Sequence, residues 1–245
     1  MIDAWSSSRA VGRSGGRIIG RVAIAVTLVL TARPPDRLSA QAGHDPASSP
    51  YKDIRRGLTL RITEGYFGGS RGPDSVPVAA TNGPTTGVRL ELQASGALTV
   101  AAGVAYANTT AKYFKSDRDS FPKPLGPVNN DIVLADFGVL LSLTGGKTWR
   151  GFQPFAGATM GLAFGSKNGA DSSGYNFGTK FTYAPELGVR WYPARRLSAE
   201  LGGRLLVYHL SFPSSYRFRI LPNILSPLSA TTVHPWATFG LAWTF

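Results

Sequence analysis

The chain ends on the stretch Trp236-Ala237-Thr238-Phe239-Gly240-Leu241-Ala242-Trp243-Thr244-Phe245, in which the character of the side chains alternates residue by residue. Successive side chains of a strand point to opposite faces. One face of this strand therefore carries Ala237 and large apolar residues, whereas the other carries small or polar ones. Such a strand suits a wall between lipid and a polar lumen. The stretch predicts a β-barrel that crosses a membrane with strands and carries an aromatic residue at its C-terminus.

The N-terminus has the organisation of a secretory signal peptide. Four arginines precede an apolar run of 11 residues, residues 22–32, and Ala40-Gln41-Ala42 provides a cleavage site, near Ala40 or Ala42. The apolar run is shorter than the roughly 20 residues that a transmembrane helix needs. We expect residues 1–42 to be a signal peptide, residues 43–56 a periplasmic tail, and residues 57–245 the barrel.

The net charge and the absence of cysteine narrow the classes of partner. The formal charge of the chain is +12, and the predicted leader carries six basic and two acidic residues, which leaves +8 on the mature part. No compact Lys/Arg cluster or basic helical face occurs, so nucleic acid is not an expected partner, whereas anionic lipid headgroups are. The chain has no cysteine and only three histidines without ligand spacing. We therefore expect no cofactor and no metal site.

Period-two alternation predicts eight strands, and the connections between them alternate in length. The turns at 95–96, 144–149 and 192–195 are short, whereas the other connections, 69–85, 112–130, 166–177 and 213–234, are long. An up-and-down barrel with both termini at the short-turn end gives this order. The predicted strands are 57–68, 86–95, 97–111, 131–144, 150–165, 178–192, 196–212 and 235–245.

Aromatic residues gather at both predicted ends of the strands. Amphipathic rings are favoured at the two interfaces of a membrane, so the pattern predicts two girdles. One set lies beside the short turns or the C-terminus, and the other lies near the long loops. The first set is Trp149, Phe152, Trp191, Tyr192, Trp243 and Phe245; the second is Tyr66, Phe67, Tyr106, Phe164, Phe181, Tyr208, Phe212 and Trp236.

The face opposite the apolar stripe carries four basic and four acidic residues. Eight strands enclose an interior that side chains can fill, so we expect these charges to pair into a salt-bridge ladder that plugs the lumen; a proton or ion path is the alternative. Glu64 shares the apolar face with Ile62, either because it lies above the membrane or because Gly65 marks a bulge. The eight charges are Arg61, Arg89, Glu91, Asp136, Glu186, Arg190, Glu200 and Arg204.

A family resemblance rests on the strand count, the loop alternation, Gln153-Pro154-Phe155-Ala156-Gly157-Ala158 at the start of a strand, and the Trp243-Thr244-Phe245 ending. By these features, residues 57–245 resemble the OmpA-, OmpX- and OmpW-like outer-membrane barrels. The resemblance implies an all-β, eight-stranded antiparallel up-and-down transmembrane barrel in the bacterial outer membrane. It also implies insertion by the outer-membrane assembly machinery, which reads the last strand at Phe239, Leu241, Trp243 and Phe245. Activities vary widely within this fold, so the resemblance names none.

The long loops are the expected place of function, because loops on a rigid scaffold commonly carry binding residues. We expect a structural, adhesive or ligand-binding role without catalysis. Basic residues in two of these loops are candidate contacts to lipopolysaccharide phosphates, and ordinary solvated loop charge is the alternative. These residues are Lys112, Lys115, Arg217 and Arg219.

A second hypothesis is a lipid A-modifying hydrolase. His209-Leu210-Ser211 resembles the His-x-Ser pair of lipid A 3-O-deacylases, with Ser211 as nucleophile and His209 as base. No Asp or Glu follows Glu200 to orient the histidine, and Phe212 stands where that family has Asn. Two further alternatives are a narrow pore for small or apolar solutes, and a soluble lipocalin-like barrel with the two faces reversed.

Overall fold

The computed structural model describes residues 49–54, 56–70, 79–115, 123–165, 175–213, 219–221, 224–225 and 229–245. The chain divides into a segment Met1–Gly43, which lies outside the described residues together with the predicted signal peptide, and a unit His44–Phe245. Only the second unit is described below. No helix of the described residues is long and apolar enough to cross a membrane.

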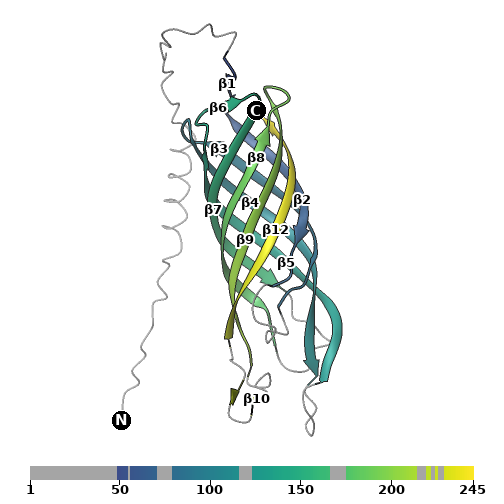
Figure 1. The fold of residues 1–245 in the computed structure, drawn as a ribbon. Helices are drawn as coiled ribbons and strands as arrows, with labels where there is room; N and C mark the ends of the chain where they lie inside the picture. Colours follow the sequence, from purple (N-terminus) through teal and green to yellow (C-terminus); the bar gives the residue numbers. More distant parts are fainter. Residues whose placement is uncertain are drawn as a thin grey trace, which may run out of the picture. The chain divides into compact units, whose positions relative to one another are not determined.

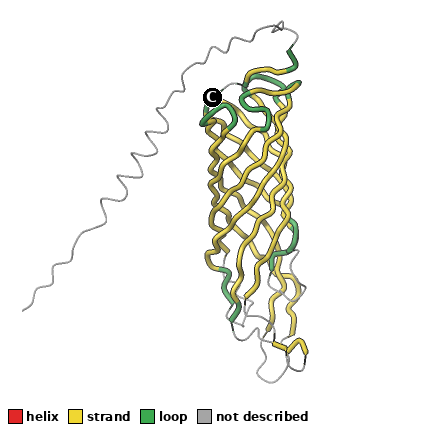
Figure 2. Tube along the Cα trace, turned by 60° about the vertical axis from the view of Figure 1, so that its left-hand side comes forward, coloured by secondary structure: helices red, strands yellow, loops and turns green. Residues whose placement is uncertain are grey.

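In the described part of the chain, eight antiparallel strands close into a barrel (Figures 1 and 2). Each barrel strand pairs with the next one along the chain, and the last strand pairs with the first over Trp236–Thr244. This closure confirms the predicted fold class. The strands are β2 (Leu58–Phe67), β3 (Gly83–Gln93), β4 (Leu98–Lys115), β5 (Lys123–Ser142), β7 (Phe152–Gly165), β8 (Gly178–Trp191), β9 (Leu197–Ser211) and β12 (Ser229–Thr244).

Burial alternates along the strands, and it runs opposite to the pattern of a soluble protein. In β3, Val88 and Leu90 point outward and are exposed, whereas Arg89 and Glu91 point inward and are buried. The same alternation continues along β12. Because neighbouring side chains of a strand face opposite sides, one apolar stripe per strand combines into an apolar outer wall. The interior is polar around the buried charges, whereas Phe67, Tyr208 and Trp236 belong to a buried hydrophobic cluster.

The predicted alternation of short and long connections holds only in part, because the connection 143–151 between β5 and β7 is longer than the connection 116–122 between β4 and β5. Among the described segments, residues 94–97, 143–151 and 192–196 join strands at one end of the barrel. The C-terminus lies at this end too (Figure 1), where the backbone N–H of Phe245 donates to the carbonyl of Leu58, 2.9 Å away. We call it the short-turn end, and the opposite end the long-loop end.

Strands β4, β5 and β12 run further than predicted at the long-loop end. β4 and β5 stay paired as far as Lys115 opposite Lys123, so much of the predicted loop 112–130 is a two-stranded ribbon. Pro124 and Pro127 pair with β4 residues in this ribbon. Proline is tolerated in strands with a free edge. β12 likewise begins at Ser229 instead of residue 235, and its pairing with β2 starts just after Pro235.

The described part of the predicted tail is not free. β1 (Tyr51–Asp53) pairs antiparallel with β6 (Lys147–Trp149), which lies in the connection between β5 and β7. Figure 1 shows this ribbon at the short-turn end. The sequence left open whether the tail enters the lumen; Ile54, directly after β1, lines a small cavity at the lumen's mouth. At the other end, β10 (Arg219–Leu221) and β11 (Ile224–Leu225) form a separate ribbon.

The girdle assignment is only partly right. Trp149, Phe152 and Trp191 are exposed on the outer wall at the short-turn end, and Tyr66, Tyr106, Phe164 and Phe181 are exposed toward the long-loop end. Phe67, Tyr208 and Trp236 were assigned to the outer girdle, and this was wrong, because all three are buried in the interior. These three residues do lie near strand ends, as predicted. The alternation of side chains along each strand, however, turns them toward the lumen.

The structure also decides the positions of Glu64 and Tyr192. Glu64 lies on the outer wall and accepts a 2.6 Å hydrogen bond from the hydroxyl of Thr86. The register of β2 with both neighbours runs without a shift through Gly65, so the bulge alternative was wrong. Tyr192, also assigned to the girdle, donates instead to Oε1 of Gln153 at 2.9 Å. It lies beyond the end of β8, and burial raises the pKa of its hydroxyl, which keeps the donor protonated.

Candidate functional site

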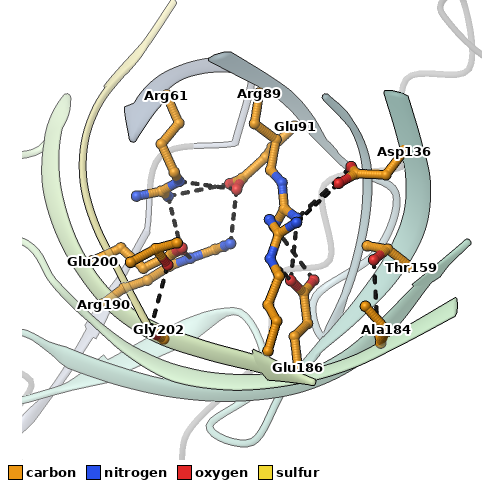
Figure 3. Close-up of polar contacts among 12 residues, drawn as sticks. Arg61, Arg89, Glu91, Asp136, Thr159, Ala184, Glu186, Arg190, Glu200 and Gly202 are labelled. Carbon is orange, nitrogen blue, oxygen red and sulfur yellow. Dashed lines mark hydrogen bonds and ion pairs between the residues drawn. The ribbon is translucent and has the colours of Figure 1, made fainter. Parts of the chain in front are cut away.

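The lumen holds all eight predicted charges, and they lie in two closed rings of alternating sign. The ring nearer the short-turn end, called the mouth ring, consists of Arg61, Glu91, Arg190 and Glu200 (Figure 3). Glu91 accepts from Arg61 at 3.0 and 3.2 Å and from Arg190 at 3.0 Å. Glu200 closes the ring at 3.4 Å from Arg61 and 2.8 Å from Arg190. Each side chain comes from a different strand.

A second ring, called the central ring, lies deeper in the barrel and consists of Arg89, Asp136, Glu186 and Arg204. Glu186 lies 3.1 Å from Arg89 and 2.8 Å from Arg204. Asp136 lies 2.9 Å from Arg204 and 3.9 Å from Arg89. Glu186 also faces Arg204 directly across the β8–β9 ladder. Both rings are neutral, so the lumen has no net charge from these groups.

A glycine makes room for the central ring. Gly103 of β4 lies between Arg89 of β3 and Asp136 of β5 in the strand register. A Cβ at this position would lie 3.2 Å from Oδ1 of Asp136. The absent side chain therefore leaves the space across which the guanidinium and the carboxylate approach each other.

Aromatic side chains fill the lumen beyond the central ring, toward the long-loop end. The imidazole of His234 stacks between the rings of Phe67 and Tyr208, with centroids 4.8 Å away on each side. Nδ1 of His234 lies 3.2 Å from the carbonyl of Gly68. A carbonyl only accepts, so Nδ1 carries the proton. Trp236 links this aromatic stack to the central ring, because its indole lies 5.0 Å under the guanidinium of Arg204.

The cavities beside the two rings are small, and a larger pocket of about 640 Å³ is lined both by Glu186, Arg204 and Trp236 and by the outer-wall residues Leu187 and Leu205. A cavity of about 30 Å³ lies beside the mouth ring, and one of about 10 Å³ lies beside the central ring. The larger of these two has room for about two waters, because a cavity needs about 10–15 Å³ of such volume per water. The arrangement acts as a solid core that ties strands together. It gives no support to a continuous path for solutes.

The candidate catalytic pair lies on the outer wall. His209 and Ser211 are both exposed near the end of β9, on the face that also carries Leu205. Nδ1 of His209 lies 3.2 Å from the hydroxyl of Thr231. Among the described contacts, no carboxylate orients this histidine. The pair lies on the outer face of the wall, where a lipid substrate could reach it. It lacks the carboxylate that would complete a catalytic triad.

The candidate lipopolysaccharide contacts are spread over the long-loop end. Lys112 and Lys115 lie in the ribbon extension of β4, and Arg219 begins β10. Arg217 lies outside the described residues. The described residues contain no group of three or more His, Asp or Glu that could hold a metal ion.

No protein-family model matches the chain, and no curated protein matches it in sequence. Solved structures do match. Neisserial surface protein A aligns with a TM-score of 0.47 at 12% identity over 80% of this chain and 98% of its own. OprG from Pseudomonas aeruginosa aligns with a TM-score of 0.49 at 13% identity over 78% and 98%. Ail, the attachment invasion locus protein of Yersinia pestis, gives 0.38 at 12% identity over 78% and 100%.

Likeness at this level says nothing about activity. The assignment of the fold rests instead on the chain's own strand order, its closure between β12 and β2, and its apolar outer wall. Over its described residues, the chain has the fold of a small eight-stranded outer-membrane β-barrel.

Proposed function

We propose that this protein is a non-catalytic, integral component of a bacterial outer membrane. Its lumen serves as a rigid core, and its long-loop end contacts ligands or partners. The supporting observation is the distribution of polarity across the wall. Leu187 and Leu201 are 68% exposed on the outside, whereas the eight ring charges are at most 13% exposed. Soluble monomers rarely expose apolar patches larger than a few hundred Å², but lipid requires such a surface.

The same observation weighs against a lipocalin-like soluble barrel. That alternative needs an apolar lumen with room for a ligand. The described lumen instead holds eight paired charges, and the cavities beside the two rings are only about 30 and 10 Å³. Burying eight charges inside a soluble barrel while exposing leucine and phenylalanine outside would raise the free energy on both faces.

The narrow-pore alternative meets the same obstacle. Ions or solutes would have to displace both rings of ion pairs and the aromatic stack. In each ring, the four side chains come from four different strands. The hydrolase alternative has His209 and Ser211 but no described carboxylate beside them. A role carried by the long-loop end therefore has the better support.

Heat-dependent mobility in SDS tests this proposal. The protein extracted from outer-membrane fractions should migrate faster unheated than boiled, because a closed, fully hydrogen-bonded barrel in lipid resists unfolding by SDS. Electrophoresis of paired unheated and boiled samples measures the shift. Identical mobility, with the protein in the soluble periplasm, would contradict the proposal and favour the reversed barrel.

Lipopolysaccharide is the partner that we propose for the long-loop end. The double variant Arg217→Gln/Arg219→Gln should bind lipopolysaccharide about tenfold to thirtyfold more weakly and co-purify with less of it, because each cation near an anionic surface contributes about a fivefold preference. Phosphate assay of the purified protein measures this. The control Arg56→Gln/Arg196→Gln removes the same charge near the short-turn end and should change nothing. Equal retention by all three proteins would rule out these contacts.

A further inference from the structure

A basic pocket lies at the short-turn end, opposite to the predicted lipopolysaccharide contacts. It has a volume of about 600 Å³ and lies between the β1–β6 ribbon and the turn that joins β8 to β9. Three cations line it, Lys52, Arg150 and Arg195, and none of them forms an ion pair with another described residue. The single acid in the lining, Asp53, lies opposite Lys147 in the β1–β6 register.

The backbone holds this pocket in place. Arg150 and Gly151 form a two-residue turn between the paired residues Trp149 and Phe152, with φ angles of 51° and 86°. Positive φ at both central positions is typical of a type I′ hairpin turn, a tight connection. The N–H of Arg150 donates to the carbonyl of Pro50, and the N–H of Tyr192 donates to the carbonyl of Gly151, both at 2.8 Å. The turn is therefore tied to the tail on one side and to the end of β8 on the other.

The pocket adjoins the apolar outer wall. Trp191 lines it and lies beside Phe152 in the β7–β8 register, and both rings are exposed. The guanidinium of Arg150 lies 5.3 Å from the ring of Trp149. Exposed tryptophans of this kind sit at the headgroup level of a membrane. A ligand here would meet cations on its polar side and an apolar wall on its other side.

We infer that this pocket binds the phosphate of a glycerophospholipid in the periplasmic leaflet, with the acyl chains along the wall below Phe152 and Trp191. The inference rests on the proposed function, because it requires the outer wall to lie in lipid. Guanidinium and ammonium groups bind phosphate through charge-assisted hydrogen bonds. The aromatic and apolar surface next to these cations favours a phospholipid, which carries acyl chains, over a free phosphate ion.

Native mass spectrometry of the full chain in detergent tests the inference. Phosphatidylglycerol should bind more tightly than zwitterionic phosphatidylcholine. The variant Arg150→Asn/Arg195→Gln should weaken phosphatidylglycerol about tenfold to thirtyfold, since each cation contributes about a fivefold preference. Asparagine is chosen at position 150 because it tolerates positive φ. The control Arg56→Gln/Arg196→Gln removes two exposed cations that do not line the pocket and should retain the lipid.

Other outcomes separate the ways in which the inference can fail. Equal loss in both double variants would show diffuse attraction to a basic surface and overturn the pocket. Displacement of the lipid by soluble glycerol phosphate at similar concentration would assign the pocket to free phosphates. The heat-dependent shift is measured on the same samples. If the shift is present while binding is unchanged, only this inference fails; if the shift is absent, the proposed function fails as well.

Discussion

Replacing Glu91 with glutamine should lower the free energy of unfolding of the barrel by about 3–5 kcal/mol, the usual cost of removing one partner from a buried ion pair. Glu91 neutralises both Arg61 and Arg190 in the mouth ring. The substitution keeps the volume and removes the charge, so two buried guanidinium groups would share Glu200 alone. Urea unfolding in phospholipid micelles, followed by tryptophan fluorescence, measures the change.

Glu64→Gln provides the matched control. It removes the same charge from the outer side of β2, where the carboxylate accepts a hydrogen bond from Thr86. We expect a change within about 1 kcal/mol, the net value of an ordinary hydrogen bond. If the two variants unfolded at the same urea concentration, the mouth ring would be passive filling of the lumen. The proposed role of the lumen as the structural core would then be wrong.

Parity explains why so much of this interior could be predicted from the sequence. Once one strand is known to be apolar on one side, every second residue must face the other side. The inward position of Arg61, Glu186 and Arg204 follows from this rule alone. The sequence also indicates that the charges lie at two levels. Glu186 and Arg190 are four residues apart on one strand, which separates them by about 13 Å along it, too far to share one ring. Which charges share a ring depends on the stagger between strands, and turn lengths alone do not reveal the stagger.

The aromatic residues show where reasoning from position fails. Phe67, Tyr208 and Trp236 lie near strand ends, as girdle residues do, yet all three lie inside the lumen. Phe67 and Tyr208 stack on His234, and Trp236 packs edge-on against Phe67. Phe67 shares the parity of Arg61 on β2, and Tyr208 shares the parity of Arg204 on β9, which would have placed both inside. Trp236 shares the face of β12 that carries Thr238 and Gly240. The pocket between the β1–β6 ribbon and the β8–β9 turn had no comparable signal. Its parts come from three distant segments of the chain, and only the closed barrel brings them together.

Replacing Leu187 with arginine should destabilise the barrel by about 2–4 kcal/mol, the cost of a cation facing lipid near the bilayer midplane. Leu187 lies on the outer side of β8, six residues from Phe181 and four from Trp191, and all three side chains are exposed on that face. Since these two aromatic residues mark opposite interfaces, Leu187 lies close to the middle of the apolar band. Equilibrium unfolding from phospholipid vesicles measures the effect.

The comparison with Leu143→Arg determines what surrounds the wall. Leu143 is 63% exposed, nearly as much as Leu187, but it lies in the connection between β5 and β7 at the short-turn end. In lipid, an arginine at this interfacial depth should cost about 0–1 kcal/mol, so the two variants should differ clearly. In water, both substitutions would change stability by no more than about 0.5 kcal/mol, as surface substitutions usually do. Equal, small effects would therefore mean that the apolar face is not in a membrane, whereas a large effect at Leu187 alone would place the middle of β8 in hydrocarbon.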